Sequence, residues 1–365
     1  MNNDTTDQNV AARSTGFFRL PPTGWLAISG TDRKSFLHNF STADIKALTD
    51  GNSCEAFILD GRGKTLWFGQ VLALPDRLLL WGGIQTMAPL NEHLDRYIIR
   101  EDVQLVNESD TMQGLFLTSA NNSDLSGDLS AILDKSFLLD LLDGSPPPNL
   151  LQQNQVVALT AQINAARLEI AGWGYLIFGN RMSIDDLASR WQQFGFSEFS
   201  TAELERLRIE SGTPWYGLDV DDRNLPQELN RDDKAISFTK GCYLGQETVA
   251  RIDALGHVNQ FLVRLGIEVD LSVETDGAPK RDDPLIDPAE PEKKIGRITS
   301  VISTRSARSI RSDSRSGSGA EAEDGQACFH SESPAYPLIG LGYVRQRYAE
   351  PGTRLQCGSG QVTVL

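Results

Sequence analysis

The sequence is poor in cysteine and histidine, the residues that most often hold metal ions. It has four of each in 365 residues, and no Cys-x-x-Cys occurs. Structural zinc sites and iron–sulfur clusters need closer sets of ligands, and four cysteines are too few for a disulfide scaffold. We therefore predict no resident metal and a reducing, cytoplasmic compartment. The cysteines are Cys54, Cys242, Cys328 and Cys357.

A surplus of basic residues is also missing. Lys and Arg number 34 against 49 Asp and Glu, which gives a net charge of −15. Proteins that bind nucleic acid along its length take their affinity from neutralised phosphates. Extended nucleic-acid binding and binding to anionic membranes are therefore disfavoured, whereas a small anionic ligand in a local cationic pocket is not excluded.

Long apolar runs are absent too. No run approaches the roughly 20 residues that span a bilayer. The first 18 residues are polar and mixed, and they contain no apolar secretory region. The sequence therefore predicts no membrane partner and no secretion, and residues 1–16 are expected to form a loose tail.

What the sequence does contain is a mixture of strand and helix patterns, expected in two or three domains. The last hundred residues predict a small all-β domain with a disordered insertion at 303–335. The chain is thus expected to be α+β. Strands are expected at Trp25–Ser29, Cys54–Leu59, Lys64–Leu74, Arg77–Trp81, Gln260–Val269, Ile295–Ile302 and Leu338–Arg345, and within Ala165–Phe178. Helices are expected after Thr31 or Asp32, over Pro89–Arg100 and Ile184–Phe194, and after the capping box of Ser200 and Glu203.

One segment, residues 240–251, concentrates chemically active side chains. It reads Lys-Gly-Cys-Tyr-Leu-Gly-Gln-Glu-Thr-Val-Ala-Arg and so combines a cation, a thiol, a phenol, an amide, a carboxylate and a guanidinium. Its order of Gly and Lys is not that of a Walker loop, and its Gly spacing is not that of a Rossmann fingerprint. The segment therefore predicts the polar lip of a pocket rather than a nucleotide loop.

This segment has two interpretations. In the first, Lys240 and Arg251 hold a carboxylate or phosphate, and Gln246 and Glu247 pair with a heterocycle. Cys242, close to a lysine, is then a candidate nucleophile or soft metal ligand. In the second, the segment is a helix start with solvated charges and one buried cysteine. The chemistry of the segment alone leaves both open.

Three runs together resemble a known family. They are Arg208-Ile-Glu-x-Gly-x-Pro214, Pro226-Gln-Glu228 and Lys240-Gly-Cys-Tyr-x-Gly-Gln-Glu-x-x-Ala-Arg251. On these runs the chain resembles the YgfZ-type folate-binding proteins, relatives of the T-protein of glycine cleavage, which is an aminomethyltransferase. A weaker likeness to the family's C-terminal barrel occurs at 340–345.

The resemblance implies a fold. It predicts a three-domain α+β ring around a central folate channel, closed by a C-terminal β-barrel. The implied division is a discontinuous α+β domain at 17–53 and 160–256, an α/β domain at 54–159, and the barrel at 257–365.

The resemblance also implies a function. The family binds tetrahydrofolate and supports the assembly or repair of iron–sulfur proteins, including some that modify tRNA. The implied partners are therefore folate and iron–sulfur enzymes or cluster-assembly proteins. The resemblance also implies that Cys242 is the functional thiol. The implied folate-binding residues are Lys240, Tyr243, Gln246, Glu247, Arg251 and Glu228.

At one place the chain departs from the T-proteins. They carry an acidic pair on a strand that follows a Gly, where this chain has Trp67 and Phe68. An aromatic ring cannot take or position a proton, so we expect an accessory protein that is not itself a classical enzyme. Two alternatives stay open. One is a folate-dependent aminomethyltransferase in which Glu247 or Asp219 replaces the missing acid, and the other is a cytosolic binding module whose Cys242 is inert.

Overall fold

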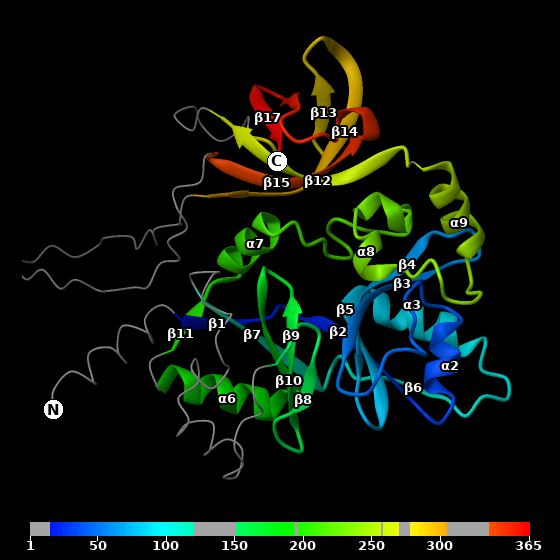
Figure 1. Ribbon diagram of the computed structural model, residues 1–365. Coiled ribbons are helices and arrows are strands. Elements are labelled where there is room, and N and C mark those ends of the chain that lie inside the picture. Colours follow the sequence, from blue (N-terminus) through cyan, green and yellow to red (C-terminus); the bar gives the residue numbers. More distant parts are fainter. Residues whose placement is uncertain (1–14, 120–150, 194–195, 257, 270–277, 305–335) are drawn as a thin grey trace, which may run out of the picture.

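The computed structural model describes residues 15–119, 151–193, 196–256, 258–269, 278–304 and 336–365. They form two β-sheets that pack face to face, helices on the outer face of each sheet, and a closed β-barrel. Figure 1 shows the barrel at one end of the molecule, with α7 (Thr201–Glu210) and α8 (Asp232–Ala235) between it and the sheets. The expected α+β class is confirmed.

The first sheet has six strands in the order β11-β1-β7-β10-β9-β8. Tyr175 and Ile177 of β10 face α6 (Arg181–Gln193), whereas Leu176 and Phe178 face the second sheet. Because successive side chains of a strand point to opposite faces, a strand buried on both faces is apolar throughout. The strands are β1 (Thr15–Arg19), β7 (Met112–Ser119), β8 (Val156–Ala158), β9 (Ile163–Glu169), β10 (Trp173–Asn180) and β11 (Ser197–Phe199).

The second sheet has five strands in the order β3-β4-β5-β2-β6. Trp67 and Val71 of β4 face the core formed with α2 (Arg33–His38) and α3 (Ile84–Asp95), whereas Leu72 faces the first sheet. Helices α2 and α3 therefore cover the outer face of this sheet, and its inner face meets the rest of the molecule. The strands are β2 (Thr23–Ser29), β3 (Ser53–Leu59), β4 (Thr65–Ala73), β5 (Arg77–Gly83) and β6 (Gln104–Asn107).

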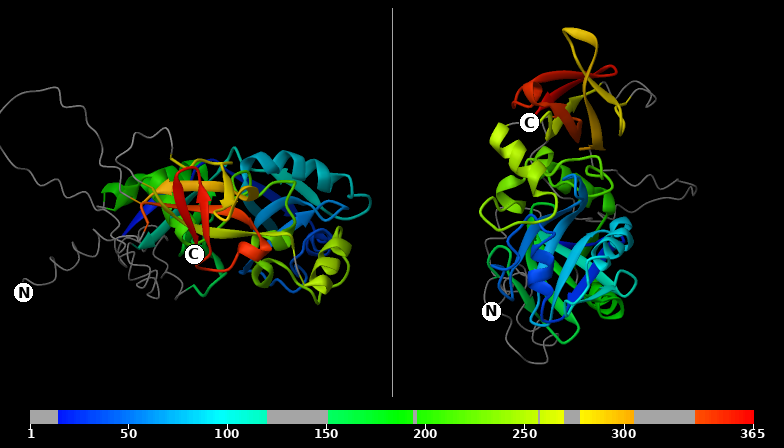
Figure 2. Two further views of the ribbon diagram at one scale, coloured as in Figure 1. Left: turned by 90° about the horizontal axis from the view of Figure 1, so that it is seen from above. Right: turned by 90° about the vertical axis from the view of Figure 1, so that its right-hand side faces the viewer.

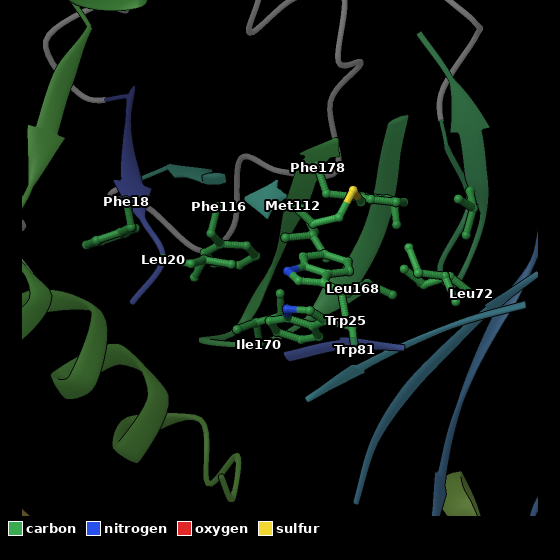
Figure 3. Packing of buried hydrophobic residues seen from close by; sticks show 14 of the residues in the cluster. Phe18, Leu20, Trp25, Leu72, Trp81, Met112, Phe116, Leu168, Ile170 and Phe178 are labelled. Atoms are coloured by element: carbon green, nitrogen blue, oxygen red, sulfur yellow. The ribbon is translucent and has the colours of Figure 1, made fainter. Parts of the chain in front are cut away.

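Aromatic side chains fill the space between the two sheets. Trp25 of β2 stacks on Phe178 of β10 with ring centroids 5.3 Å apart, and its ring lies 6.0 Å from that of Trp81 of β5. Figure 3 shows Trp25 and Trp81 side by side in this core, with Leu168 and Met112 nearby. Burial of side chains of this size contributes about 1.5–3 kcal/mol each, so this core holds the two sheets together.

The C-terminal barrel is closed by six strands in the order β12-β15-β14-β13-β16-β17, which confirms the expected barrel. Ile209 of α7 packs against Leu341 and Tyr343 of β15. The right-hand view in Figure 2 agrees with Figure 1 in placing the barrel over one end of the sheets. The barrel strands are β12 (Gln260–Glu268), β13 (Pro284–Asp287), β14 (Glu290–Ser303), β15 (Leu338–Arg345), β16 (Arg354–Cys357) and β17 (Gly360–Val364). The short helices η2 (Pro226–Leu229) and η4 (Gln346–Tyr348) and the helix α9 (Gln246–Leu255) complete the fold.

Helix α3 differs from its sequence expectation at both ends. It begins at Ile84, ahead of Pro89, and ends at Asp95. The helical spacing of Leu90, Leu94, Tyr97 and Ile98 set the expected range at Pro89–Arg100, and the turn ahead of Pro89 was missed. Packing fixes the turn before it instead, because buried Met87 lies against Gly24 of β2, where an added Cβ would be 2.3 Å from the Met87 Cγ.

The sheets do not follow the expected ranges 17–53, 54–159 and 160–256. Strand β2 lies in the first range but pairs with β5 and β6, and β7 lies in the second but pairs with β1 and β10. The division into domains stays a prediction. Thr15 and Gly16, expected in the loose tail, belong to β1, and Ser303, expected to open the insertion, ends β14. Residues 1–14 and 305–335 lie outside the described residues.

Candidate functional site

A cavity of about 250 Å³ lies between the second sheet and the loop 213–218. Its walls come from β3, β4 and β5, from the end of β9, and from the loop. Phe68, Trp81, Trp215 and Tyr216 line it with aromatic rings. A mostly apolar cavity with a few polar groups is the usual form of a small-molecule site.

Three neighbouring strands place one row of side chains on the cavity wall. Glu55 of β3 lies directly opposite Gln70 of β4, and Gln70 lies directly opposite Trp81 of β5. Residues opposite each other on adjacent strands point to the same face of a sheet, and all three line the cavity. We call Glu55, Gln70 and Trp81 the cavity row.

Two carboxylates of the cavity wall share one arginine. Arg231 Nε donates to Glu55 Oε2 at 2.6 Å, and its Nη2 donates to Glu55 Oε1 and lies 3.8 Å from Glu169 Oε2. Lys234 forms a further ion pair with Glu169. Burial disfavours the charged guanidinium, yet the two glutamates raise the pKa of Arg231 above its ordinary value. The negative charges of the two glutamates are therefore balanced by two cationic side chains, Arg231 and Lys234.

Asp219, fully buried, fixes the loop 213–218. Its Oδ2 accepts from Arg208 Nη1 at 2.6 Å and from the Trp215 N–H at 3.1 Å. Its Oδ1 accepts from the hydroxyls of Thr299 and Ser300, at 2.6 and 2.7 Å, where β14 is irregular against β15. One carboxylate thus joins the cavity loop, α7 and the barrel.

Lys240, the first residue of the 240–251 segment, is an anchor in this structure. Its Nζ donates to the carbonyl oxygens of His38, Ser41 and Ala43 at 2.6, 2.5 and 2.9 Å, and it lies 4.9 Å from the ring centroid of Tyr243. Burial lowers the pKa of Lys240 to about 8. Because an ammonium group has three donors, these contacts tie the segment to the end of α2 and use every donor of the side chain.

The same segment is locked to the turn that follows β3. Gly63 and Gly245 have φ of 80° and 82°, and a Cβ on Gly245 would lie 2.5 Å from the carbonyl oxygen of Asp60. Thr248 Oγ1 donates to the Arg62 carbonyl at 2.9 Å. Glycine permits both the positive φ and the close approach of the two backbones, so the turn and the segment form one packed unit.

Gly245→Ala is therefore expected to lower the free energy of unfolding by at least about 2 kcal/mol, since left-handed backbone strain and the contact with Asp60 add. Gly241→Ala is the matched control in the same segment. Gly241 has no positive φ, and its added Cβ would meet nothing within 4 Å. We expect it to stay within about 0.5 kcal/mol of the wild type in urea denaturation. Equal effects of the two substitutions would contradict the packing described for Gly245.

The other implied site residues take separate places. Gln246 Oε1 accepts from the Tyr243 N–H at 3.1 Å at the start of α9. Glu228 is buried in η2, where its carboxylate accepts from the Asn224 side chain at 3.0 Å. The exposed members of the set are Cys242, Glu247 and Arg251.

None of the seven implied site residues lines the cavity, and their role in folate binding stays a prediction. The segment and the cavity are still connected, because Phe68 of the cavity wall shares a buried cluster with Tyr243 and Val249. Sequence reasoning missed the cavity row. The signal was present as Glu55 and Gln70, polar residues within the otherwise apolar strands β3 and β4.

No group of three His, Cys, Asp or Glu side chains in the described residues is placed to hold a metal ion. Within the same part of the chain, no helix has the length and apolar composition needed to cross a membrane.

Comparison with known proteins gives distant relatives along most of the chain. No family model matches. The chain is 24% identical to a putative chloroplastic transferase of Arabidopsis thaliana over 346 residues, which are 92% of the chain and 66% of that relative. The chain thus spans just under two thirds of that protein's length. It is 22% identical to the tRNA-modifying protein YgfZ of Colwellia psychrerythraea over 263 residues, 72% of this chain and 75% of the other.

The fold itself has a counterpart in a solved structure. The glycine cleavage system aminomethyltransferase T from Bartonella henselae matches with a TM-score of 0.71 at 16% identity, over 98% of this chain and 87% of the other. The chain has a YgfZ-type, T-protein-like fold. The resemblance expected from the three sequence runs is confirmed, and this chain combines that fold with a cavity beside the loop 213–218.

Proposed function

We propose that this YgfZ-type chain binds tetrahydrofolate in the cavity and supports the assembly or repair of iron–sulfur proteins in the cytoplasm, including enzymes that modify tRNA. The cavity carries the proposal, because it lies in a T-protein-like fold and combines aromatic walls with few, buried polar groups. The exposed Cys242 is the thiol that we assign to work on partner proteins.

The cavity suits the pterin ring of a folate in shape and in polarity. Trp81, Trp215 and Tyr216 line it with planar rings. Glu55, Gln70 and Glu169 add a few polar side chains to these walls. The cavity row would hold the ring, and the folate would supply a carrier for one-carbon units.

Reduced folate is expected to raise the melting temperature of the purified protein. A ligand that binds only the native state stabilises it by about 2.7 kcal/mol at a hundred times Kd. The measurement is a thermal unfolding curve with and without 5-formyltetrahydrofolate. The control is p-aminobenzoylglutamate, which lacks the pterin. No shift at millimolar folate, or an equal shift with the control, would contradict folate binding through the ring.

A folate-dependent aminomethyltransferase is the second candidate, favoured by the fold alone. Four placements weigh against it. Phe68 stands on the cavity wall, and Trp67 is buried among α2 and α3. Asp219 already accepts four hydrogen bonds, and Glu247 is exposed on α9. A glycine-cleavage assay with lipoyl carrier protein separates the candidates, because robust turnover would reject the accessory role.

A further inference from the structure

We propose that Arg281 is a positioning residue that holds the loop 213–218 closed over the cavity, and that this loop opens and closes as a lid. Arg281 lies just ahead of β13 of the barrel and outside the cavity lining. It therefore acts on the ligand through the loop and not by contact. The inference rests on the proposed folate binding for its kinetic test, and it adds control of the rates at which the ligand enters and leaves.

The first step is the set of contacts at the tip of the loop. Arg281 Nη2 donates to the carbonyl oxygens of Gly217 and Leu218, at 3.0 and 2.9 Å. From another part of the fold, Gln85 Nε2 at the start of α3 donates to the Tyr216 carbonyl oxygen at 2.8 Å. Three successive carbonyl groups of the loop are thus held by two long side chains, one from the barrel and one from the second sheet's helix.

The second step is the difference between the base and the tip of the loop. At the base, Thr213 and Asp219 are buried, and Arg208 Nη1 donates to an oxygen of each, at 2.7 and 2.6 Å. At the tip, the hydrogen bonds from Gln85 and Arg281 are exposed, and water replaces the partner when such a bond breaks. The tip is therefore the part of the loop that opens at the lowest cost, while the base stays in place.

The third step is the position of the hinge. Gly217 has φ of 89°, and an added Cβ would lie 1.7 Å from Gln85 Nε2. Glycine adopts positive and negative φ about equally readily, so the backbone can turn at Gly217 once these hydrogen bonds break. Tyr216, Gly217 and Leu218 line the cavity, and so does Ile84, which is 41% exposed. The cavity thus reaches the surface beside the tip, and a turn at Gly217 widens this opening.

The first test needs no ligand. The Gly217 N–H donates to the Val220 carbonyl oxygen at 2.7 Å, and a turn at Gly217 breaks this bond. Hydrogen–deuterium exchange of the Gly217 amide in the full chain therefore measures how often the tip opens. We expect Arg281→Ala, which removes two hydrogen bonds, to exchange about tenfold faster than the wild type. Lys280→Ala is the matched control. It removes a neighbouring exposed cation that holds neither carbonyl group, and it should exchange at the wild-type rate.

The second test measures the rates of ligand binding. The probe is 5-formyltetrahydrofolate, followed by stopped-flow tryptophan fluorescence, since Trp81 and Trp215 line the cavity. In Arg281→Ala the free and the liganded loop lose the same two bonds. Association and dissociation should therefore both be about tenfold faster, whereas Kd should stay within about threefold of the wild type. Arg281→Lys keeps a donor and should bring both rates part of the way back. Lys280→Ala should bind and release the probe at wild-type rates.

The outcomes separate the lid from the proposed function. Folate binding with unchanged rates or unchanged exchange in Arg281→Ala overturns the lid and leaves the proposed function standing. A weaker Kd with an unchanged association rate also overturns the lid, because the open loop must admit the ligand faster. Equal effects of Arg281→Ala and Lys280→Ala overturn the role of the two hydrogen bonds.

Faster exchange in Arg281→Ala, combined with no folate binding by the wild type, supports the lid and overturns the proposed function. If Arg281→Ala fails to fold, Gln85→Ala takes its place and is read by exchange alone, because Gln85 itself lines the cavity. Faster exchange of the Gly217 amide in that variant supports the lid, and unchanged exchange overturns it.

Discussion

Asp219→Ala is expected to lower the free energy of unfolding by about 3–5 kcal/mol, the usual loss when one partner of a buried ion pair is removed. Arg208, fully buried, would keep its charge without its buried counter-ion. The hydroxyls of Thr299 and Ser300 and the Trp215 N–H would lose their acceptor as well. Chemical denaturation measures the loss.

Asp221→Ala is the matched control two residues away. Asp221 pairs with Arg223, which is largely exposed, and exposed ion pairs contribute under about 1 kcal/mol. A small effect of Asp219→Ala, similar to that of Asp221→Ala, would show that the barrel and the cavity loop do not depend on this carboxylate. A second variant, Thr299→Val, removes a single donor and should cost about 1 kcal/mol.

Cys242→Ala is expected to fold normally and to bind folate, but to lose the ability to support iron–sulfur enzymes in a deletion strain. The side chain of Cys242 is exposed and does not line the cavity, so its removal disturbs neither the core nor the ligand site. The activities of cluster-dependent enzymes in the complemented strain are the measurement. Full rescue by Cys242→Ala would favour the alternative in which this thiol is inert.

Two other cysteines of the chain serve as controls. Burial raises the pKa of Cys54 to about 12 and that of Cys357 to about 11, and a thiol must ionise before it reacts. Iodoacetamide should therefore modify Cys242 well before Cys54 and Cys357, as peptide mass spectrometry would show. Cys54→Ala should rescue the strain. Faster modification of Cys54 than of Cys242 would contradict the accessibility seen here. Cys328 lies outside the described residues.

Local patterns predicted the local structure of this chain well. The capping box of Ser200 and Glu203 is present at the start of α7, with both hydrogen bonds formed. The strand expected at Cys54–Leu59 is β3, Ser53–Leu59. Neighbouring residues determine such elements, because capping and alternation depend only on positions a few residues apart.

The pairing of distant strands could not be predicted in this way. β1 pairs with β7 nearly a hundred residues later and with β11 later still, and no local period records such partners. The cavity row has the same origin, since Glu55, Gln70 and Trp81 meet only through strand register. Arg208 was read as part of a motif, and its complete burial became visible only once Asp219 and Ser300 were placed around it.

The four hydrogen bonds that converge on Asp219 limit how this protein can be divided into fragments. A fragment that ended before β12 would take away Thr299 and Ser300, and with them two of the four donors to that carboxylate. Ile209 would also lose its apolar partners on β15. Trp215, bonded to the same carboxylate, would then line the cavity from a loosened loop. If such a truncated protein failed to bind a ligand, the cause would be the lost support of the cavity loop by the barrel. The failure would not show that the barrel contacts the ligand.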